Sequence, residues 1–258
     1  MIGAGGGIVM RIFVAILATL LCAACQTTES VQFQPSINQQ AIVRDGQPAL
    51  VSTKKNSIVI VRPASRRLQI GGRPVFIVGI FNRTTRPLNF RVSDIDVTQT
   101  VNGGEAHLKV ITYEELVQEE HTRQAFRALA VGLAAAGNSI SASRAGYYNY
   151  SSTIYAPSGT YLANTTGYSP TAAAIAQANA NAMNANMIEA TVARGQASLA
   201  YLERAVIKDD TLMPGEWYGG QLHVQPLISA GGQVKRYTIS VLVGSERHEI
   251  QIVQGASS

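Results

Sequence analysis

The chain has 258 residues and a formal net charge of +5, and its two cysteines, Cys22 and Cys25, both lie near the amino terminus. This length suits one elaborated domain or two small domains. The body after Cys25 contains no cysteine, which excludes an internal disulfide and a thiolate metal site there. No apolar run after Cys25 is long enough to span a bilayer.

Residues 1–24 have the three-part layout of an export signal. Arg11 is followed by an apolar stretch over residues 12–21 and then by two alanines that directly precede Cys25. The stretch is too short to cross a membrane. This region resembles a bacterial lipoprotein signal with its lipobox, although Cys22 occupies the position where that family usually has leucine. The resemblance implies removal of residues 1–24 and acylation of Cys25 with fatty acyl chains such as palmitate.

The resemblance also implies a location. Each buried CH₂ contributes about 0.8 kcal/mol, so membrane lipid would hold an acylated Cys25 almost permanently. Gln26, rather than aspartate, follows the cysteine, which resembles lipoproteins sorted to the outer membrane. We therefore expect a protein of the cell envelope, anchored in the outer membrane and facing the periplasm or the cell surface. An uncleaved or conventionally cleaved signal is the alternative, and Met10 is the expected start because residues 1–9 carry no positive side chain.

Residues 25–48 are expected to form the lipidated amino terminus and a tether. Residues 26–40 are polar and weakly patterned, which favours no stable element. From residue 49 to 111 the apolar residues recur with a period of two, in short segments rich in β-branched and aromatic residues. Strands are predicted at 57–62, 67–70, 75–81, 88–92, 95–98 and 107–111.

The same alternation returns over residues 211–254, with strands predicted at 221–226, 235–243 and 247–253. Turn residues separate these strands without intervening helices, which favours an antiparallel sandwich over a parallel sheet. The stretch from Val78 to Phe90 and the element from Pro214 to Gly220 resemble extracytoplasmic immunoglobulin-like modules of bacterial lipoproteins. The resemblance implies that residues 49–111 and 211–254 complete one immunoglobulin-like sandwich, with a role in binding or assembly.

Residues 112–210 are predicted to form an antiparallel helical hairpin that projects from the sandwich, so the fold is mainly β with an α insertion. Thr112 and Glu115 have the spacing of a capping box, and acidic residues precede basic ones in the first turns, as a helix dipole favours. Farther along, apolar residues recur in steps that are typical of a helix seam. These residues are Phe126, Leu129, Leu133 and Ile140.

A second helix is predicted over residues 171–208, where alanine is frequent and proline is absent. The first half of this helix offers little apolar area, so it needs the first helix, or copies of itself from other chains, to remain ordered. The seam predicts packing within the hairpin or self-association as a coiled coil. Its residues include Ile188, Val192, Leu199, Leu202 and Val206.

Residues 144–170 are predicted to form the tip of the hairpin as a loosely ordered loop, because they contain few aliphatic residues. Tyrosine with serine, glycine and asparagine is also the composition of adaptable binding loops, so a contact surface is the alternative. The tyrosines that would form this surface are Tyr147, Tyr148, Tyr150, Tyr155, Tyr161 and Tyr168.

Motifs for catalysis or cofactor binding are lacking. His107, His121, His223 and His248 have no metal-ligand spacing, and the sequence has neither a nucleophile elbow nor a phosphate-binding loop. Residues 41–110 hold eleven Lys/Arg against four Asp/Glu, which fits a solvated basic face or contact with anionic lipid or cell-wall polymer. We therefore expect no enzyme, no cofactor and no metal site, and the export signal disfavours nucleic acid as a partner.

Two functions remain after these exclusions. The favoured one is a non-enzymatic envelope lipoprotein that scaffolds or assembles a larger complex through its sandwich and hairpin. Its partners would be other proteins or copies of itself. The alternative is a lipoprotein that binds polysaccharide or cell-wall polymer with the tyrosine-rich loop or the basic sheet face.

Overall fold

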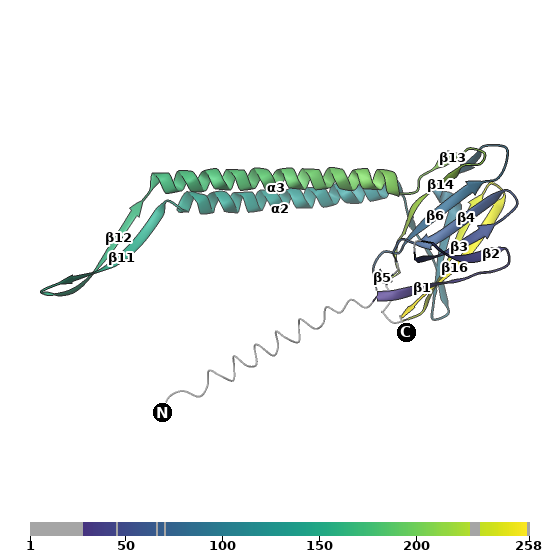
Figure 1. Cartoon of the computed structure of the whole chain (residues 1–258), viewed down its shortest axis with the longest axis horizontal. Coiled ribbons are helices and arrows are strands. Elements are labelled where there is room, and N and C mark those ends of the chain that lie inside the picture. The colour runs from purple at the N-terminus through teal and green to yellow at the C-terminus, as the bar shows by residue number, and fades with distance from the viewer. Residues whose placement is uncertain (1–27, 45, 66, 70, 228–232, 257–258) are drawn as a thin grey trace, which may run out of the picture. The chain divides into compact units, whose positions relative to one another are not determined.

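The structure, a computed structural model, describes residues 28–44, 46–65, 67–69, 71–227 and 233–256. The chain divides into two compact units, one made of the residues up to Thr112 together with those from Ala205 onward, and the other of Tyr113–Arg204. The first unit holds two antiparallel sheets and the second holds two helices packed as a hairpin (Figure 1). The predicted fold class, a β-sandwich interrupted by a helical hairpin, is confirmed.

The first six-stranded sheet has the strand order β5-β1-β16-β15-β8-β9, and every neighbouring pair is antiparallel. Its strands are β5 (Arg67–Gln69), β1 (Thr28–Gln34), β16 (Glu246–Ala256), β15 (Lys235–Val243), β8 (Ile95–Val101) and β9 (Gly104–Leu108).

The second six-stranded sheet has the order β10-β14-β6-β4-β3-β2 and is also antiparallel. A two-stranded pair, β13 (Asp210–Leu212) with β7 (Leu88–Phe90), and the short helix η1 (Val92–Asp94) complete the unit. The strands of the second sheet are β10 (Val110–Ile111), β14 (Trp217–Val224), β6 (Val75–Asn82), β4 (Ser57–Pro63), β3 (Gln47–Thr53) and β2 (Gln39–Arg44).

The core of the sandwich draws on the chain before and after the helical insertion. Along β4, buried and half-buried residues alternate, as the period of two in a strand requires. Val59 and Phe76 come from before the insertion, Leu222 and Ile239 come from after it, and all four are buried in one cluster. β14 pairs with β6 and β15 pairs with β8. Residues on both sides of the insertion therefore complete one core, as predicted.

The predicted tether is wrong over the part that the structure describes. β1 and β2 lie within residues 28–44, and β1 pairs with β16 on one side and β5 on the other. Glu29 is 1% exposed and Val31 is 7% exposed, so β1 contributes to the interior. Glu29 occupies an inward position of β1, where the alternating pattern of a strand would have an apolar residue. In a sequence, a glutamate normally indicates a position that faces solvent, so the pattern of β1 is not recognised. Lys235 compensates the Glu29 carboxylate here, with its Nζ 2.9 Å from Glu29 Oε2.

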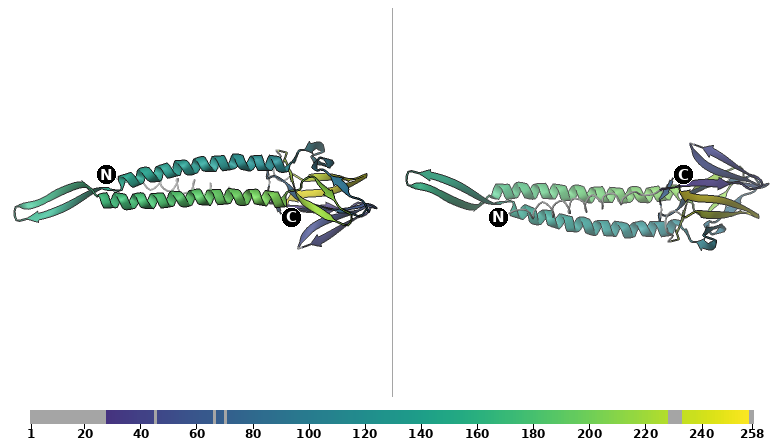
Figure 2. Two further views of the ribbon diagram at one scale, coloured as in Figure 1. Left: turned by 90° about the horizontal axis from the view of Figure 1, so that it is seen from above. Right: turned by 90° about the horizontal axis from the view of Figure 1, so that it is seen from below.

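The second unit is built on α2 (Tyr113–Arg144) and α3 (Pro170–Ala205), which lie side by side along their length (Figure 2). Ser169 begins α3: its Oγ accepts a hydrogen bond from Ala172 N at 3.2 Å, and Pro170 occupies the first helical position. The insertion ends at Arg204, a few residues before the predicted boundary at 210.

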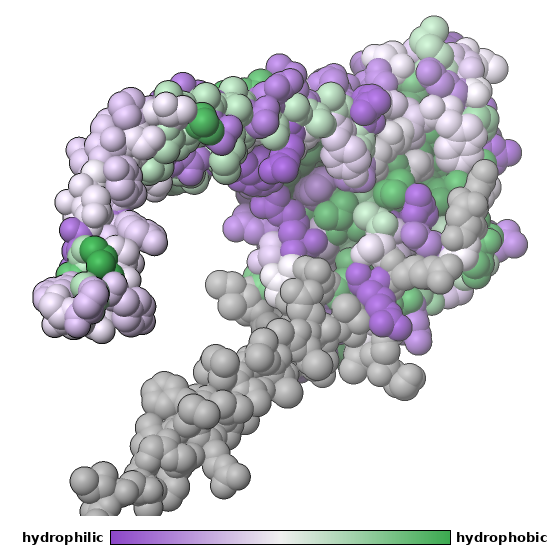
Figure 3. All heavy atoms as spheres, turned by 60° about the vertical axis from the view of Figure 1, so that its left-hand side comes forward, coloured by the Kyte–Doolittle hydropathy of each residue, from purple (hydrophilic) through white to green (hydrophobic). Residues whose placement is uncertain are grey.

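Between the two helices the chain forms a regular β-hairpin, which corrects the prediction of a loosely ordered loop. β11 (Tyr147–Ala156) pairs with β12 (Gly159–Tyr168) in unbroken register from Tyr147↔Tyr168 to Ala156↔Gly159. Threonine and tyrosine favour strands, and cross-strand aromatic contacts stabilise such pairs without an aliphatic core. Figure 3 shows a small patch of hydrophobic residues near the free end of this β-hairpin, among weakly hydrophilic ones.

Candidate interaction surface of the helical hairpin

The contact between α2 and α3 consists mainly of small and polar residues. Gln124 Nε2 donates to Gly195 O at 3.1 Å, and Asn138 Nδ2 donates to Asn184 Oδ1 at 2.8 Å. Ala142 and Ala180 are buried, at 5% and 6% exposure. A Cβ on Gly195 would lie 2.9 Å from Gln124 Cδ, so glycine permits the close approach. Little apolar area is therefore buried between the helices, and hydrogen bonds and close contact hold them together.

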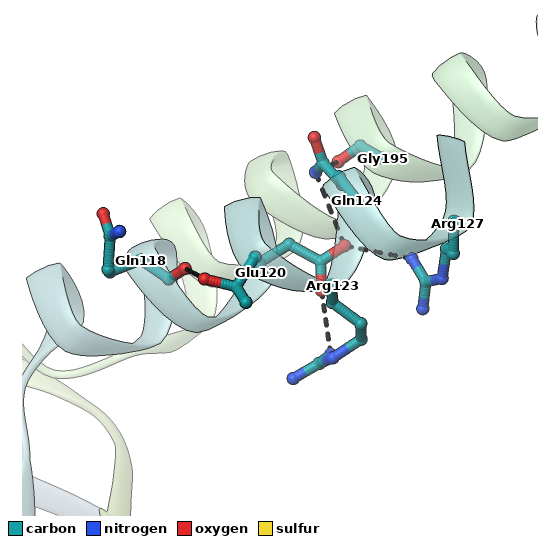
Figure 4. Close-up of polar contacts among 7 residues, drawn as sticks. Gln118, Glu120, Arg123, Gln124, Arg127 and Gly195 are labelled. Atoms are coloured by element: carbon teal, nitrogen blue, oxygen red, sulfur yellow. Dashed lines mark hydrogen bonds and ion pairs between the residues drawn. The ribbon is translucent and has the colours of Figure 1, made fainter. Parts of the chain in front are cut away.

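A buried carboxylate lies on α2 next to this contact (Figure 4). The Glu120 side chain is 3% exposed and accepts from Arg123 Nη1 at 2.8 Å and Arg127 Nη1 at 3.1 Å. Gln124 Nε2 lies 3.4 Å from the same carboxylate. Two guanidinium groups on one helix thus offset the burial of one negative charge, so this cluster is a structural feature of the hairpin and holds no spare ligand group.

The seam predicted on α2 does not face α3. Its large side chains are exposed, with exposed fractions of 69% for Phe126, 62% for Leu129, 68% for Leu133 and 55% for Ile140. At about 100° per residue these four positions lie about half a turn from the contact face that carries Glu120, Gln124, Asn138 and Ala142. We call Phe126, Leu129, Leu133 and Ile140 the α2 stripe. The stripe points away from α3, and nothing in the described unit covers it.

The seam predicted on α3 is displaced from the actual contact by roughly 50°, about a seventh of a turn. Ile188 and Val192 are 53% and 54% exposed, whereas Leu199 and Leu202 are half-buried. Val206 is buried, but it follows α3 and bridges Gln221 in the sandwich unit. Because alanine and asparagine occupy nearly half of α3, apolar spacing alone does not define its contact face.

The six predicted contact tyrosines all lie on β11 and β12, and each is at least half exposed. The rings of Tyr147 and Tyr168 pack with centroids 4.9 Å apart, and Tyr148 lies over its cross-strand partner Gly167, where a Cβ would come within 2.4 Å of the ring. An open depression of about 530 Å³ lies at this base of the hairpin, lined by Tyr147, Tyr148, Asn149, Thr166, Gly167 and Tyr168.

The histidines of the sandwich do not converge on a catalytic site. His107 Nδ1 lies 3.0 Å from Asp96 Oδ1 at the exposed edge formed by β8 and β9. His223 alternates with the buried Leu222 and Val224 on β14, so it faces away from the core. His248 is buried on β16 in the other sheet. Among the described residues no group of three or more His, Cys, Asp or Glu side chains could hold a metal ion.

His248 instead joins the two sheets. Ser57 Oγ donates to Glu246 Oε2 at 2.6 Å, so the imidazole Nε2, 2.8 Å away, is the donor to Ser57 Oγ. Nδ1 then accepts from Ser52 Oγ at 3.0 Å. Burial, aided by the Lys54 cation and opposed by Glu246, lowers the pKa of His248 to about 4. The neutral ring is therefore the form that the fold requires.

Acid is expected to destabilise the sandwich through His248. His248 takes up a proton near its ordinary pKa of 6.5 in the unfolded state and only near 4 in the folded state. The free energy of unfolding therefore has its full value above pH 6.5 and falls as the pH drops toward 4. The loss reaches about 3 kcal/mol. Urea unfolding at pH 7 and pH 4.5 measures it. His248→Gln should flatten the pH dependence, and an unchanged dependence in that variant would contradict this assignment.

Comparison with protein families, with curated proteins and with solved structures found no match for this chain. No helix in the described ranges is long and apolar enough to cross a membrane. Cys25, the predicted lipidation site, lies outside the described residues. The candidate site of the described chain is therefore the surface of its second unit, formed by the α2 stripe and the two tyrosine-bearing strands.

Proposed function

We propose that this protein is a non-enzymatic lipoprotein of the cell envelope that acts as an assembly component, with its helical hairpin as the binding element. The observation that carries the proposal is the exposed α2 stripe: the apolar side chains of α2 point outward while polar and small residues make the contact with α3. The partners are other protein subunits or copies of the chain.

The spacing of the stripe supports a helical protein partner. Phe126, Leu129, Leu133 and Ile140 recur in steps of three, four and seven, the spacing by which one helix packs against another. Each such side chain gains about 1.5–3 kcal/mol when it is fully buried. Contiguous exposed apolar surface on a protein commonly marks an interaction site. Burial against a partner would therefore supply the apolar area that the α2–α3 contact lacks.

The anchor in the proposal comes from the amino-terminal sequence. Acylation of Cys25 would keep the sandwich and the hairpin at a membrane, most simply the outer membrane, where local concentration favours association. An assembly component needs such a fixed location but no reacting groups. The hydrogen-bonded groups around His248 and Glu120 have structural roles, which agrees with this proposal.

Replacement of Cys25 by alanine is expected to abolish incorporation of labelled palmitate and to move the protein from the membrane fraction to the soluble fraction, because no other residue would carry the anchor. Cys22→Ala is the matched control and should leave both properties unchanged. Fractionation of cells with radiolabelled lipid measures both. A Cys25→Ala chain that stays in the membrane fraction and remains labelled would contradict the anchor.

The second candidate is the binding of polysaccharide or cell-wall polymer. The depression of about 530 Å³ at the base of β11 and β12 favours it, since exposed tyrosine rings line a space into which a sugar could stack. The stripe on α2 has no role in that function, so assembly accounts for more of the exposed surface.

A further inference from the structure

The β11–β12 hairpin has two unpaired edges. In the described chain β11 pairs only with β12, and the two strands of ten residues each form a sheet of their own. An isolated two-stranded hairpin is marginally stable in water, and three or more strands are usually needed. Each outer edge presents a row of N–H and C=O groups that can pair with another strand. Both edges of the hairpin can therefore accept a further strand.

These edges lack the features by which proteins block edge pairing. Charged side chains, proline and bulges are the usual protection. No Asp, Glu, Lys or Arg occurs between Arg144 and Glu189, and the one proline of the hairpin, Pro157, lies in the turn. The register runs from Tyr147↔Tyr168 to Ala156↔Gly159 without a bulge. In a chain with a formal charge of +5, this uncharged segment lets identical copies approach without repulsion.

Lipid is a poor occupant for these edges. The hairpin has exposed Ile154, Tyr155 and Leu162 near its turn, but a lone two-stranded sheet in a bilayer would leave its outer N–H and C=O groups without partners. A strand of equal length satisfies them. The β11–β12 hairpin of a second copy offers such a strand, with ten residues and no charge.

One edge of the β11–β12 hairpin and the α2 stripe together offer enough surface for a specific contact between two copies of the chain. A ten-residue strand is about 33 Å long, and the α2 stripe from Phe126 to Ile140 adds roughly 21 Å. A strip of this length and about 10 Å wide covers roughly 500 Å² on each copy, or about 1,000 Å² in total, where specific interfaces begin. Both elements belong to one compact unit, Tyr113–Arg204. A copy that uses both edges of its hairpin doubles the strand part of this area.

We propose that β11 and β12 pair edge to edge with the same hairpin of a second copy of the chain, so that neighbouring copies build one continuous antiparallel or parallel sheet. This inference rests on the proposed assembly function and names its partner. The α2 stripe of each copy packs within the same contact, and the tyrosine rings cover the faces of the joined sheet.

A photo-activatable benzophenone side chain at Ser151, an exposed β11 position, tests the pairing in the detergent-solubilised full chain. We expect cross-linked dimers whose junction, mapped by mass spectrometry, falls within residues 147–168 of the other copy. Cross-links only to phosphatidylcholine added to the detergent micelles, or to a different protein, or to other parts of the chain, would overturn the inference.

Charge on the hairpin supplies the matched comparison. Asn149→Lys with Asn164→Lys places two lysines on exposed hairpin positions, and Asn179→Lys with Asn186→Lys places the same charge on exposed positions of α3. The hairpin pair should lower the cross-linking yield at least tenfold, and the α3 pair should leave it within twofold. Equal loss in both variants would overturn the inference.

The native mass and the cross-links together distinguish failure of edge pairing from failure of the proposed assembly function. A native mass above that of the monomer, lost on change of the α2 stripe but without hairpin cross-links, would overturn edge pairing alone. A strictly monomeric chain with no bound protein and no hairpin cross-links would overturn both.

Discussion

Leu133→Glu is expected to dissociate the proposed complexes of the protein and to leave its fold intact. Leu133 lies in the middle of the α2 stripe and is 68% exposed in the single chain, so its replacement disturbs no internal packing. In a complex the change removes about 2 kcal/mol of apolar burial and places an unpaired carboxylate in the contact. We expect the Kd to rise roughly hundredfold in sedimentation-velocity titrations.

The control for this variant is Ser141→Glu, which adds the same charge to an exposed position of α2 outside the stripe. It should associate like the natural chain, and circular dichroism should show the same helix content in both variants. An unchanged Kd for Leu133→Glu would mean that the α2 stripe does not mediate association.

Lys235→Met is expected to destabilise the sandwich more than any surface change. Lys235 Nζ lies 2.9 Å from Glu29 Oε2, and the two side chains are 4% and 1% exposed. Removing the cation leaves a buried carboxylate uncompensated, which costs about 3–5 kcal/mol. A loss of this size lowers the Tm by roughly 10 °C, which thermal unfolding at pH 7 measures.

The double variant Glu29→Gln with Lys235→Met separates charge from packing, because it removes both members of the ion pair. Most of the lost Tm should return in it. If Lys235→Met melted at the same temperature as the natural chain, β1 would not be held in the interior as the structure has it.

The sequence predicts the sandwich and the helical hairpin because both depend on the spacing of apolar residues. Alternation in β4, β6 and β15 and the charge order at the start of α2 are local signals that the packed structure retains. The predicted export signal rests on an equally local pattern, and its residues lie outside the described part of the chain. β1 is missed because its inward Glu29 is compensated by Lys235, which is far away in the sequence.

The candidate surface is predicted only in part, and the reason differs between its two elements. The periodicity correctly groups Phe126, Leu129, Leu133 and Ile140 on one face of α2, but it does not tell whether that face meets α3 or another chain. The hydrogen bonds of Gln124 and Asn138 and the close approach at Gly195 decide this. The strands β11 and β12 are missed because their composition lacks the aliphatic residues by which strands are recognised, whereas the cross-strand packing of Tyr147 on Tyr168 is visible only in the structure.

The native mass of the full chain purified in mild detergent tests whether the protein assembles through its helical hairpin. We expect a mass that is a multiple of the single chain, or that of the chain with a bound protein subunit. Leu133→Glu should shift the mass to that of one chain, whereas Ser141→Glu should not. A natural chain that is strictly monomeric, at every concentration and without any co-purifying protein, would show that the protein is not an assembly component.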